Sequence, residues 1–219
     1  MGNIFLAIIL VLIEIFIIKK YQQKEAEYGK ELSKKEMGIM AAYTYVFSMS
    51  TLLATRIFHS AFRSIIVALL LMALCVTLVV TAYMDEKSGH FQFELLLADI
   101  VVSIALFVAW LQGRGGFFNT KEIITLLVVL CVIFFLGMFA FSLGDALILA
   151  NVYIAMFVSY PRISVAAILV ALFVAISFTL IRGGKKAIEE KSLKLKMPFT
   201  MAISVGAVAG FVVIASALT

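Results

Sequence analysis

The chain has 219 residues, of which 64% are hydrophobic and only 14% charged, and its formal net charge is +5. Soluble domains usually carry about 25% charged residues, and a chain of this length cannot hide so much apolar surface from water, so a soluble globular domain is excluded. Lysines that flank membrane helices account for the positive charge, and we expect no nucleic-acid partner.

The apolar residues form unbroken runs, which predicts an all-α polytopic membrane protein, because helices satisfy their own backbone groups in lipid. A membrane β-barrel would instead show short segments of alternating hydrophobicity. A run of about 20 apolar residues is enough to cross a bilayer. We expect about eight transmembrane helices, at residues 3–18, 38–54, 64–84, 92–112, 122–142, 145–160, 163–181 and 198–217.

The first two helices frame a polar segment, Lys19 to Glu36, which is rich in Lys and Glu and which we expect to be helical. The first run lacks a basic start, contains Glu14 and is followed by its lysines, so it predicts a retained anchor rather than a secretory signal. We therefore divide the chain into an N-terminal membrane anchor with a short cytoplasmic charged segment (1–37) and a multi-helix membrane domain (38–219). The run at 38–54 is the least apolar, because Ser and Thr residues dilute it.

The basic residues predict the orientation. Thirteen of the 18 Lys and Arg residues lie in the connections after the first, third, fifth and seventh expected helices, and five lie in the alternate connections. Cytoplasmic loops are the ones enriched in Lys and Arg. We therefore expect a multi-pass protein of the cell (inner) membrane whose two termini face outward.

Two of the three aspartates fall at the cytoplasmic membrane edge in this orientation. Asp85 ends the third expected helix and Asp145 begins the sixth. Two carboxyls at equal depth suit an aspartic peptidase, in which one activates water and the other donates a proton. A helix N-terminus favours an anion and a helix C-terminus disfavours one, so we expect Asp145 to be ionised and Asp85 to hold a shared proton. The alternative is that both aspartates only cap helices or extend toward the head groups.

The other acidic residues near the membrane are expected at different depths. Asp99 lies inside the fourth expected helix, and we expect a buried side chain hydrogen-bonded to a Ser or Thr of a neighbouring helix. We expect Glu14 to extend toward the membrane surface and Glu94 to lie at the interface. The two cysteines, Cys75 and Cys131, form no CxxC pair, so the sequence predicts neither a metal site nor a disulfide framework.

Three segments together resemble type IV prepilin peptidases, which are intramembrane aspartic proteases. Residues 139–149, with Ser-Leu-Gly-Asp at 142–145, resemble the GxGD motif region of this family. Residues 82–90 resemble the first aspartate motif, and residues 194–199 resemble the lysine and Pro-Phe entry to the last helix. The three segments occur in the family's order, and the resemblance covers roughly residues 64–219.

The resemblance implies a GxGD aspartic protease-like bundle of about eight helices. It implies that Asp85 and Asp145 are catalytic and that Gly144, Ser142, Pro198 and Phe199 support the site. The implied substrates are prepilins or pilin-like proteins of a type IV pilus system, whose basic leader peptides are cut at the cytoplasmic face of the lipid bilayer. No metal or other cofactor is implied.

The sequence departs from the family at several positions. Ser142 replaces the first motif glycine, Ala146 and Leu147 replace Val-Lys, and Thr200 and Met201 stand where Gly-Pro often follows Pro-Phe. Two other functions are therefore kept open. One is a catalytically inactive scaffold of a pilus or secretion assembly, and the other is a proton-coupled membrane transporter that uses Asp99 and Glu14.

Overall fold

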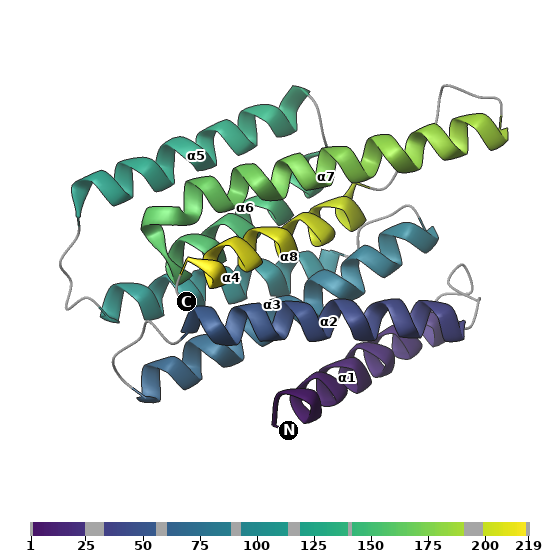
Figure 1. Cartoon of the computed structure of the whole chain (residues 1–219), viewed down its shortest axis with the longest axis horizontal. Coiled ribbons are helices and arrows are strands. Elements are labelled where there is room, and N and C mark those ends of the chain that lie inside the picture. Colours follow the sequence, from purple (N-terminus) through teal and green to yellow (C-terminus); the bar gives the residue numbers. More distant parts are fainter. Residues whose placement is uncertain are drawn as a thin grey trace.

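The computed structural model describes residues 2–24, 33–55, 61–88, 93–113, 119–139, 142–190 and 199–217. These residues form eight α-helices and no strand, so the predicted all-α architecture is confirmed for the described part of the chain (Figure 1). The helices are α1 (Gly2–Lys24), α2 (Lys34–Thr55), α3 (Ala61–Ser88), α4 (Phe93–Gly113), α5 (Thr120–Phe139), α6 (Leu143–Ser159), α7 (Pro161–Glu190) and α8 (Thr200–Ser216).

Among the described residues, four helices are long and apolar enough to cross a membrane. They contain the stretches Ile65–Lys87, Phe93–Gln112, Thr120–Gly137 and Pro161–Gly183. The apolar helices α6 and α8 are shorter. That these two helices, α1 and α2 also cross the membrane stays a prediction.

Two helices continue well beyond the ends that hydrophobicity predicted. α1 runs to Lys24 rather than residue 18, and α7 runs to Glu190 rather than residue 181. Lys, Gln and Glu are good helix formers, so a helix need not stop where its apolar run stops. The division that we placed after residue 37 falls inside α2, which begins at Lys34.

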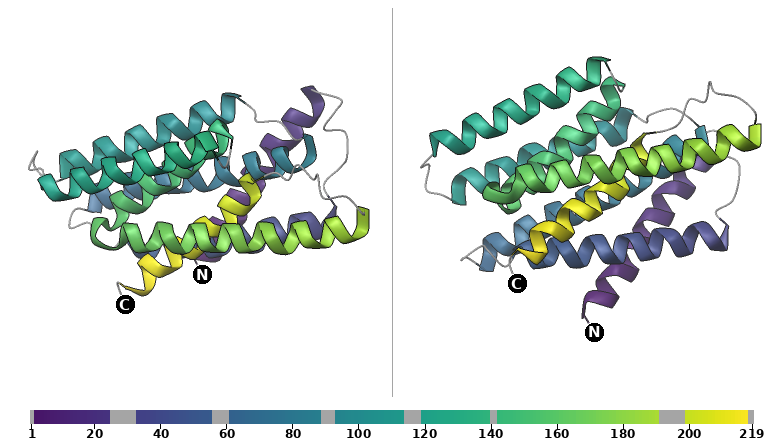
Figure 2. Two further views of the ribbon diagram at one scale, coloured as in Figure 1. Left: turned by 90° about the horizontal axis from the view of Figure 1, so that it is seen from above. Right: turned by 45° about the horizontal axis from the view of Figure 1, so that its top comes forward.

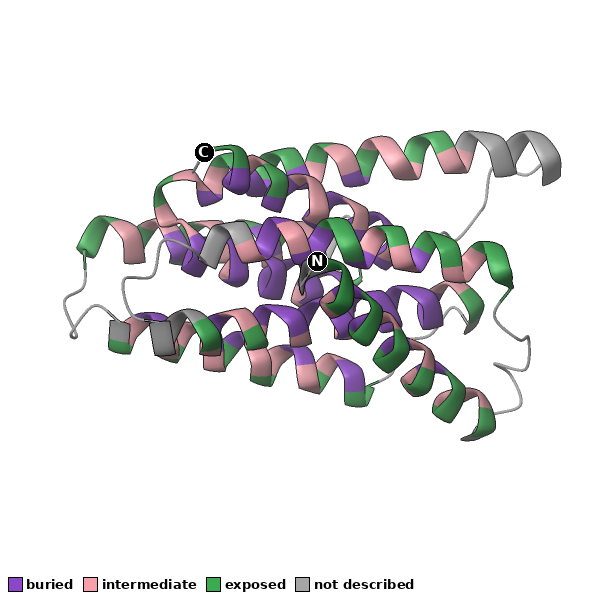
Figure 3. Ribbon diagram, turned by 60° about the horizontal axis from the view of Figure 1, so that its bottom comes forward, coloured by how far each residue is buried: buried purple, intermediate pink, exposed green. Residues whose placement is uncertain are grey.

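α3 is the central helix of the bundle. It packs against α1, α2, α4 and α8, and 61% of its membrane-length stretch is buried, against 17–28% for the other three stretches. α1 and α5 lie at opposite sides of the molecule (Figures 1 and 2). Buried residues face the centre and exposed ones the outside (Figure 3). Large apolar side chains such as Phe16 and Phe173 are exposed on outer faces, as lipid contact requires.

Small residues bring α7 and α8 close together. A Cβ added at Gly206 would overlap the carbonyl oxygen of Ala171, and one added at Gly210 would lie 2.9 Å from the carbonyl oxygen of Ala167. Glycine and alanine at four-residue spacing let membrane helices approach closely, because association in lipid depends on packing rather than on the hydrophobic effect. This contact holds α8 in the bundle.

The buried Ser and Thr residues of α2 form hydrogen bonds within the protein. The hydroxyls of Ser48, Ser50 and Thr51 donate to backbone carbonyls of the preceding turn. Thr44 instead reaches α1, where its hydroxyl lies 2.9 and 3.0 Å from the two carboxyl oxygens of Glu14. Glu14 is fully buried, so the expectation that it extends to the membrane surface is wrong. α2 covers this face of α1, which the sequence of α1 alone does not show.

Candidate active site

Three helix ends meet at one end of the bundle and carry three buried polar residues. Asp85 lies near the end of α3, Asp145 in the first turn of α6, and Thr200 is the first residue of α8. Their exposed fractions are 5%, 7% and 0%. α8 packs against both α3 and α6, so its N-terminus lies between the other two ends (Figure 1).

Asp145 is held by the cap of its own helix. Ser142 is the N-cap residue of α6, and its hydroxyl accepts a hydrogen bond of 3.1 Å from the Asp145 backbone N–H. In return, the Ser142 hydroxyl and backbone N–H donate to Oδ2 of Asp145 at 2.7 and 3.3 Å. This reciprocal arrangement is a capping box. It fixes the carboxyl in one orientation and leaves Oδ1 for other partners.

Thr200 links Asp145 to Asp85. Its hydroxyl donates to Oδ1 of Asp145 at 3.2 Å. The hydroxyl and the backbone N–H of Thr200 also lie near the Asp85 carboxyl, which is close enough to Asp145 to feel its charge. A threonine hydroxyl has one proton to donate and two lone pairs to accept with, so it can connect two carboxyls that share a proton. The structure thus brings together the two aspartates that the sequence singled out.

The setting of Asp85 differs from the one expected. The sequence places this residue at the C-terminal end of α3, where the helix dipole disfavours an anion. In the structure the carboxyl also faces the N-terminus of α8, whose first-turn N–H groups need acceptors, and Phe199 at the N-cap has no polar side chain to supply one. Two helix dipoles therefore act on Asp85 in opposite directions. Its Oδ2 has no hydrogen-bond partner among the described residues.

The other residues that the resemblance assigned to the site surround this contact. Ser142 is exposed at the start of α6, Gly144 is half-buried as its second residue, and Phe199 is buried at the start of α8. Pro198 lies outside the described residues. In the sequence, Thr200 stands out only as a departure from the family pattern. Its position at the start of the last apolar run was the feature of the sequence that could have pointed to a role at the site.

A pocket of about 110 Å³ lies between α2, α3 and α8. Ala82 and Glu86, on either side of Asp85 in α3, line it, and so does Met201, which follows Thr200. The remaining wall is mostly apolar and aromatic and is made by Glu36, Ile39, Met40, Tyr43, Val79, Tyr83, Lys87, Ser204 and Val205. An apolar side chain can therefore be accommodated next to the turn of α3 that carries Asp85, although neither Asp85 nor Asp145 lines the pocket.

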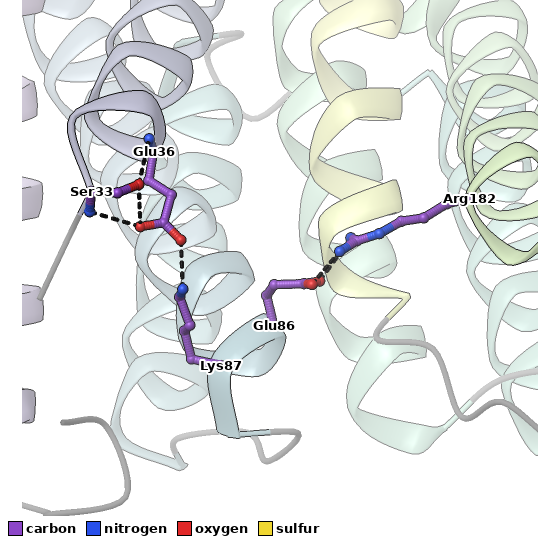
Figure 4. Close-up of polar contacts among 5 residues, drawn as sticks. All are labelled: Ser33, Glu36, Glu86, Lys87 and Arg182. Atoms are coloured by element: carbon purple, nitrogen blue, oxygen red, sulfur yellow. Dashed lines mark hydrogen bonds and ion pairs between the residues drawn. The ribbon is translucent and has the colours of Figure 1, made fainter. Parts of the chain in front are cut away.

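Two ion pairs fasten the same end of α3 to its neighbours (Figure 4). Nζ of Lys87 lies 2.5 Å from Oε1 of Glu36 in α2. Both terminal nitrogens of Arg182 in α7 contact the Glu86 carboxyl, one of them at 2.7 Å. The Lys87 contact, together with the Ser33 N–H, lowers the pKa of Glu36 to about 2. These contacts restrain the backbone next to Asp85.

The remaining membrane acids have their own partners. Asp99 is fully buried and accepts a hydrogen bond from Thr77 of α3, as expected. Glu94 accepts one of 2.8 Å from Tyr21 of α1. In the part of the chain that the structure describes, no three His, Cys, Asp or Glu side chains are grouped as a metal site would need.

Comparisons with known proteins identify no relative: no family model matches the chain, and neither a curated protein nor a solved structure shows significant similarity to it.

Proposed function

We propose that this protein is an intramembrane aspartic endopeptidase that removes basic leader peptides from prepilins or pilin-like proteins. The observation that carries the proposal is the contact of Thr200 with both Asp85 and Asp145, two buried carboxyls from different helices. Burying an acidic side chain in a membrane protein costs free energy, so such residues generally have a function. The resemblance of three sequence segments to prepilin peptidases points to the same pair.

The chemistry follows from the hydrogen bonds. Asp145 receives three donors, which suits the carboxylate that takes a proton from water. The water oxygen bonds to the peptide carbonyl carbon, and the protonated Asp85 then gives its proton to the leaving amine as the C–N bond breaks. Thr200 accepts from the protonated Asp85 and donates to Asp145, which keeps both carboxyls aligned.

The same proposal includes the membrane topology. All eight helices cross the cell (inner) membrane, both termini face outward, and both aspartates lie at the cytoplasmic edge. The excess of basic residues in alternate connections supports this orientation. The pocket between α2, α3 and α8 offers an apolar surface to the substrate near the end of α3.

Removal of a leader from a prepilin-like substrate tests the proposal in membranes. Asp85→Asn and Asp145→Asn should each abolish cleavage, because Asn cannot exchange the shared proton, while an Asn at position 145 still accepts the hydrogen bonds of the cap. Because the two residues act as one unit, the double variant should be no worse than either single variant. Rates are normalised to the abundance of each variant.

Glu14→Gln is the matched control, since it replaces a buried acid of α1 whose hydrogen bonds are made with Thr44 of α2 and not with the residues of the pair. This variant should cleave normally. Cleavage that survives both aspartate substitutions would refute the peptidase.

An inactive scaffold of a pilus or secretion assembly is the second candidate, and the capping box favours it. A carboxyl that caps α6 has a structural role without any chemistry. In that case the wild-type protein cleaves no leader. Asp145→Ala then lowers the free energy of unfolding by about 1 kcal/mol, because the cap of α6 is lost. A transporter that uses Asp99 and Glu14 receives less support, because each of these acids is bonded to a threonine of the neighbouring helix.

A further inference from the structure

A line of buried polar residues runs from the aspartates into the bundle. Thr77, Thr81 and Asp85 recur every four residues, so they lie on one face of α3, each about 6 Å further along the helix axis. Thr77 hydrogen-bonds Asp99 of α4, and Ser103 lies one turn further along the same face of α4. α3 and α4 pack against each other along this line.

Most polar atoms of this line lack partners. Oγ1 of Thr81, Oδ2 of Asp85, Oδ2 of Asp99 and Oγ of Ser103 are buried without a hydrogen bond to any described residue. The exposed fractions of these four residues are 5% or less. A buried polar atom without a partner destabilises the fold, and native structures usually satisfy such atoms with ordered water. Four such atoms lie along the contact between two neighbouring helices, which indicates a common cause.

We propose that this line is a water-binding path, in which ordered water molecules connect Ser103, Asp99, Thr77 and Thr81 to Asp85. One water molecule with two hydrogen bonds of about 2.8 Å bridges polar atoms about 4.5 Å apart, so one or two water molecules span the rise of about 6 Å between successive positions. Resting on the proposed function, the path also holds water next to Asp85, where the peptidase consumes it. A hydrolase whose site lies at the hydrocarbon edge needs such a supply.

Isotope exchange at introduced thiols tests the path directly. In a background of Cys75→Ala and Cys131→Ala, single variants Thr81→Cys and Ser103→Cys place one S–H group on the line. Val76→Cys is the matched control, because Val76 is also buried in α3 but lies on a different face of the helix. Infrared absorption of the S–H group, followed after transfer to D₂O, reports contact with water.

The thiols at positions 81 and 103 should exchange at least about tenfold faster than the thiol at position 76. Adding Thr81→Val to Ser103→Cys should slow exchange at position 103, because the isosteric valine interrupts the chain of waters. Equal exchange at positions 76, 81 and 103, or unchanged exchange at 103 behind the valine, would overturn the path. The readout needs no cleavage, so an inactive protein that still exchanges would refute the peptidase and leave the water path intact.

Discussion

Thr200 shows how one side chain sets the geometry of a site. Its hydroxyl donates to Asp145 and its backbone N–H, the first of α8, reaches Asp85. The chain thereby uses a helix N-terminus and a hydroxyl to hold two carboxyls that would otherwise repel each other. If the pair is catalytic, Thr200 is a positioning residue, because it aligns the carboxyls without touching the substrate.

Thr200→Val should therefore lower kcat for leader cleavage by about 10–100-fold while KM stays the same. Valine keeps the shape of threonine and removes only the hydroxyl. Thr200→Ser restores the hydroxyl and should recover most of the rate. Steady-state kinetics of the three proteins, with abundance measured in each, make the comparison. A wild-type kcat in the valine variant would show that the hydroxyl contact is incidental.

Glu36 gives a pH-dependent contribution to stability. Its pKa falls from 4.5 to about 2, mainly through the hydrogen bond from Lys87 and next through the Ser33 N–H. A carboxyl with a lowered pKa stabilises the folded state above its unfolded pKa and loses that contribution as the pH falls from about 4.5 to 2. Because the pair is about 30% exposed, solvent screens it, and the contribution should be well under about 1 kcal/mol.

Glu36→Gln should accordingly lower the thermal unfolding temperature at pH 6 by a degree or two. The difference from the wild-type protein should shrink as the pH falls and vanish near pH 2. Unfolding in detergent, followed by circular dichroism at several pH values, measures it. A difference that grows toward low pH would contradict this assignment.

At the scale of the element, the helix ends are held by specific contacts. α2 begins with Ser33 and Glu36, whose side chains and backbone N–H groups exchange hydrogen bonds of 2.8–3.2 Å, and α6 begins with the same arrangement at Ser142 and Asp145. The N-terminus of α8 has no side-chain cap of this kind, and the Asp85 carboxyl of α3 lies near it instead. The position of α8 therefore depends on its packing against α7.

Gly206→Ala tests this packing. The added methyl group meets the backbone of Ala171, which cannot move aside without shifting α7. The free energy of unfolding should therefore fall by about 1–3 kcal/mol. Gly38→Ala is the matched control, because a Cβ at Gly38 in α2 has no atom within 4 Å. Alanine should stabilise that helix by up to about 1 kcal/mol. Equal effects of the two substitutions on SDS-induced unfolding would argue against close α7–α8 packing.

At the scale of the whole molecule, α3 is enclosed and the outer helices expose apolar faces. The orientation in the membrane is a prediction from charge alone. Cysteine introduced at Lys35, near the start of α2, should be protected from an impermeant thiol reagent in intact cells, while cysteine at Lys121, near the start of α5, should react. Both lysines are exposed in the first turns of their helices, so the pair is matched. The opposite labelling pattern would place the aspartates on the outer face and remove the cytoplasmic site.

The sequence by itself determined the class of fold and the number of helices. Lipid leaves the backbone few alternatives, so composition and unbroken apolar runs were sufficient to predict eight helices. The ends of the apolar runs did not predict where α1 and α7 end. A helix continues as long as its residues favour helical structure, in lipid or in water. The burial of Asp99 against a threonine was also predictable, because a carboxyl inside a membrane helix needs a polar partner.

Only the tertiary structure decided which residues meet. Glu14 is buried because α2 covers it, Asp85 faces the start of a helix that comes much later in the chain, and Thr200 joins two carboxyls from α3 and α6. Hydrophobicity is nearly uniform over the apolar runs, so it does not tell one helix face from another. The faces that touch are selected by close packing of small residues such as Gly206 and Gly210, and this selection exists only between helices.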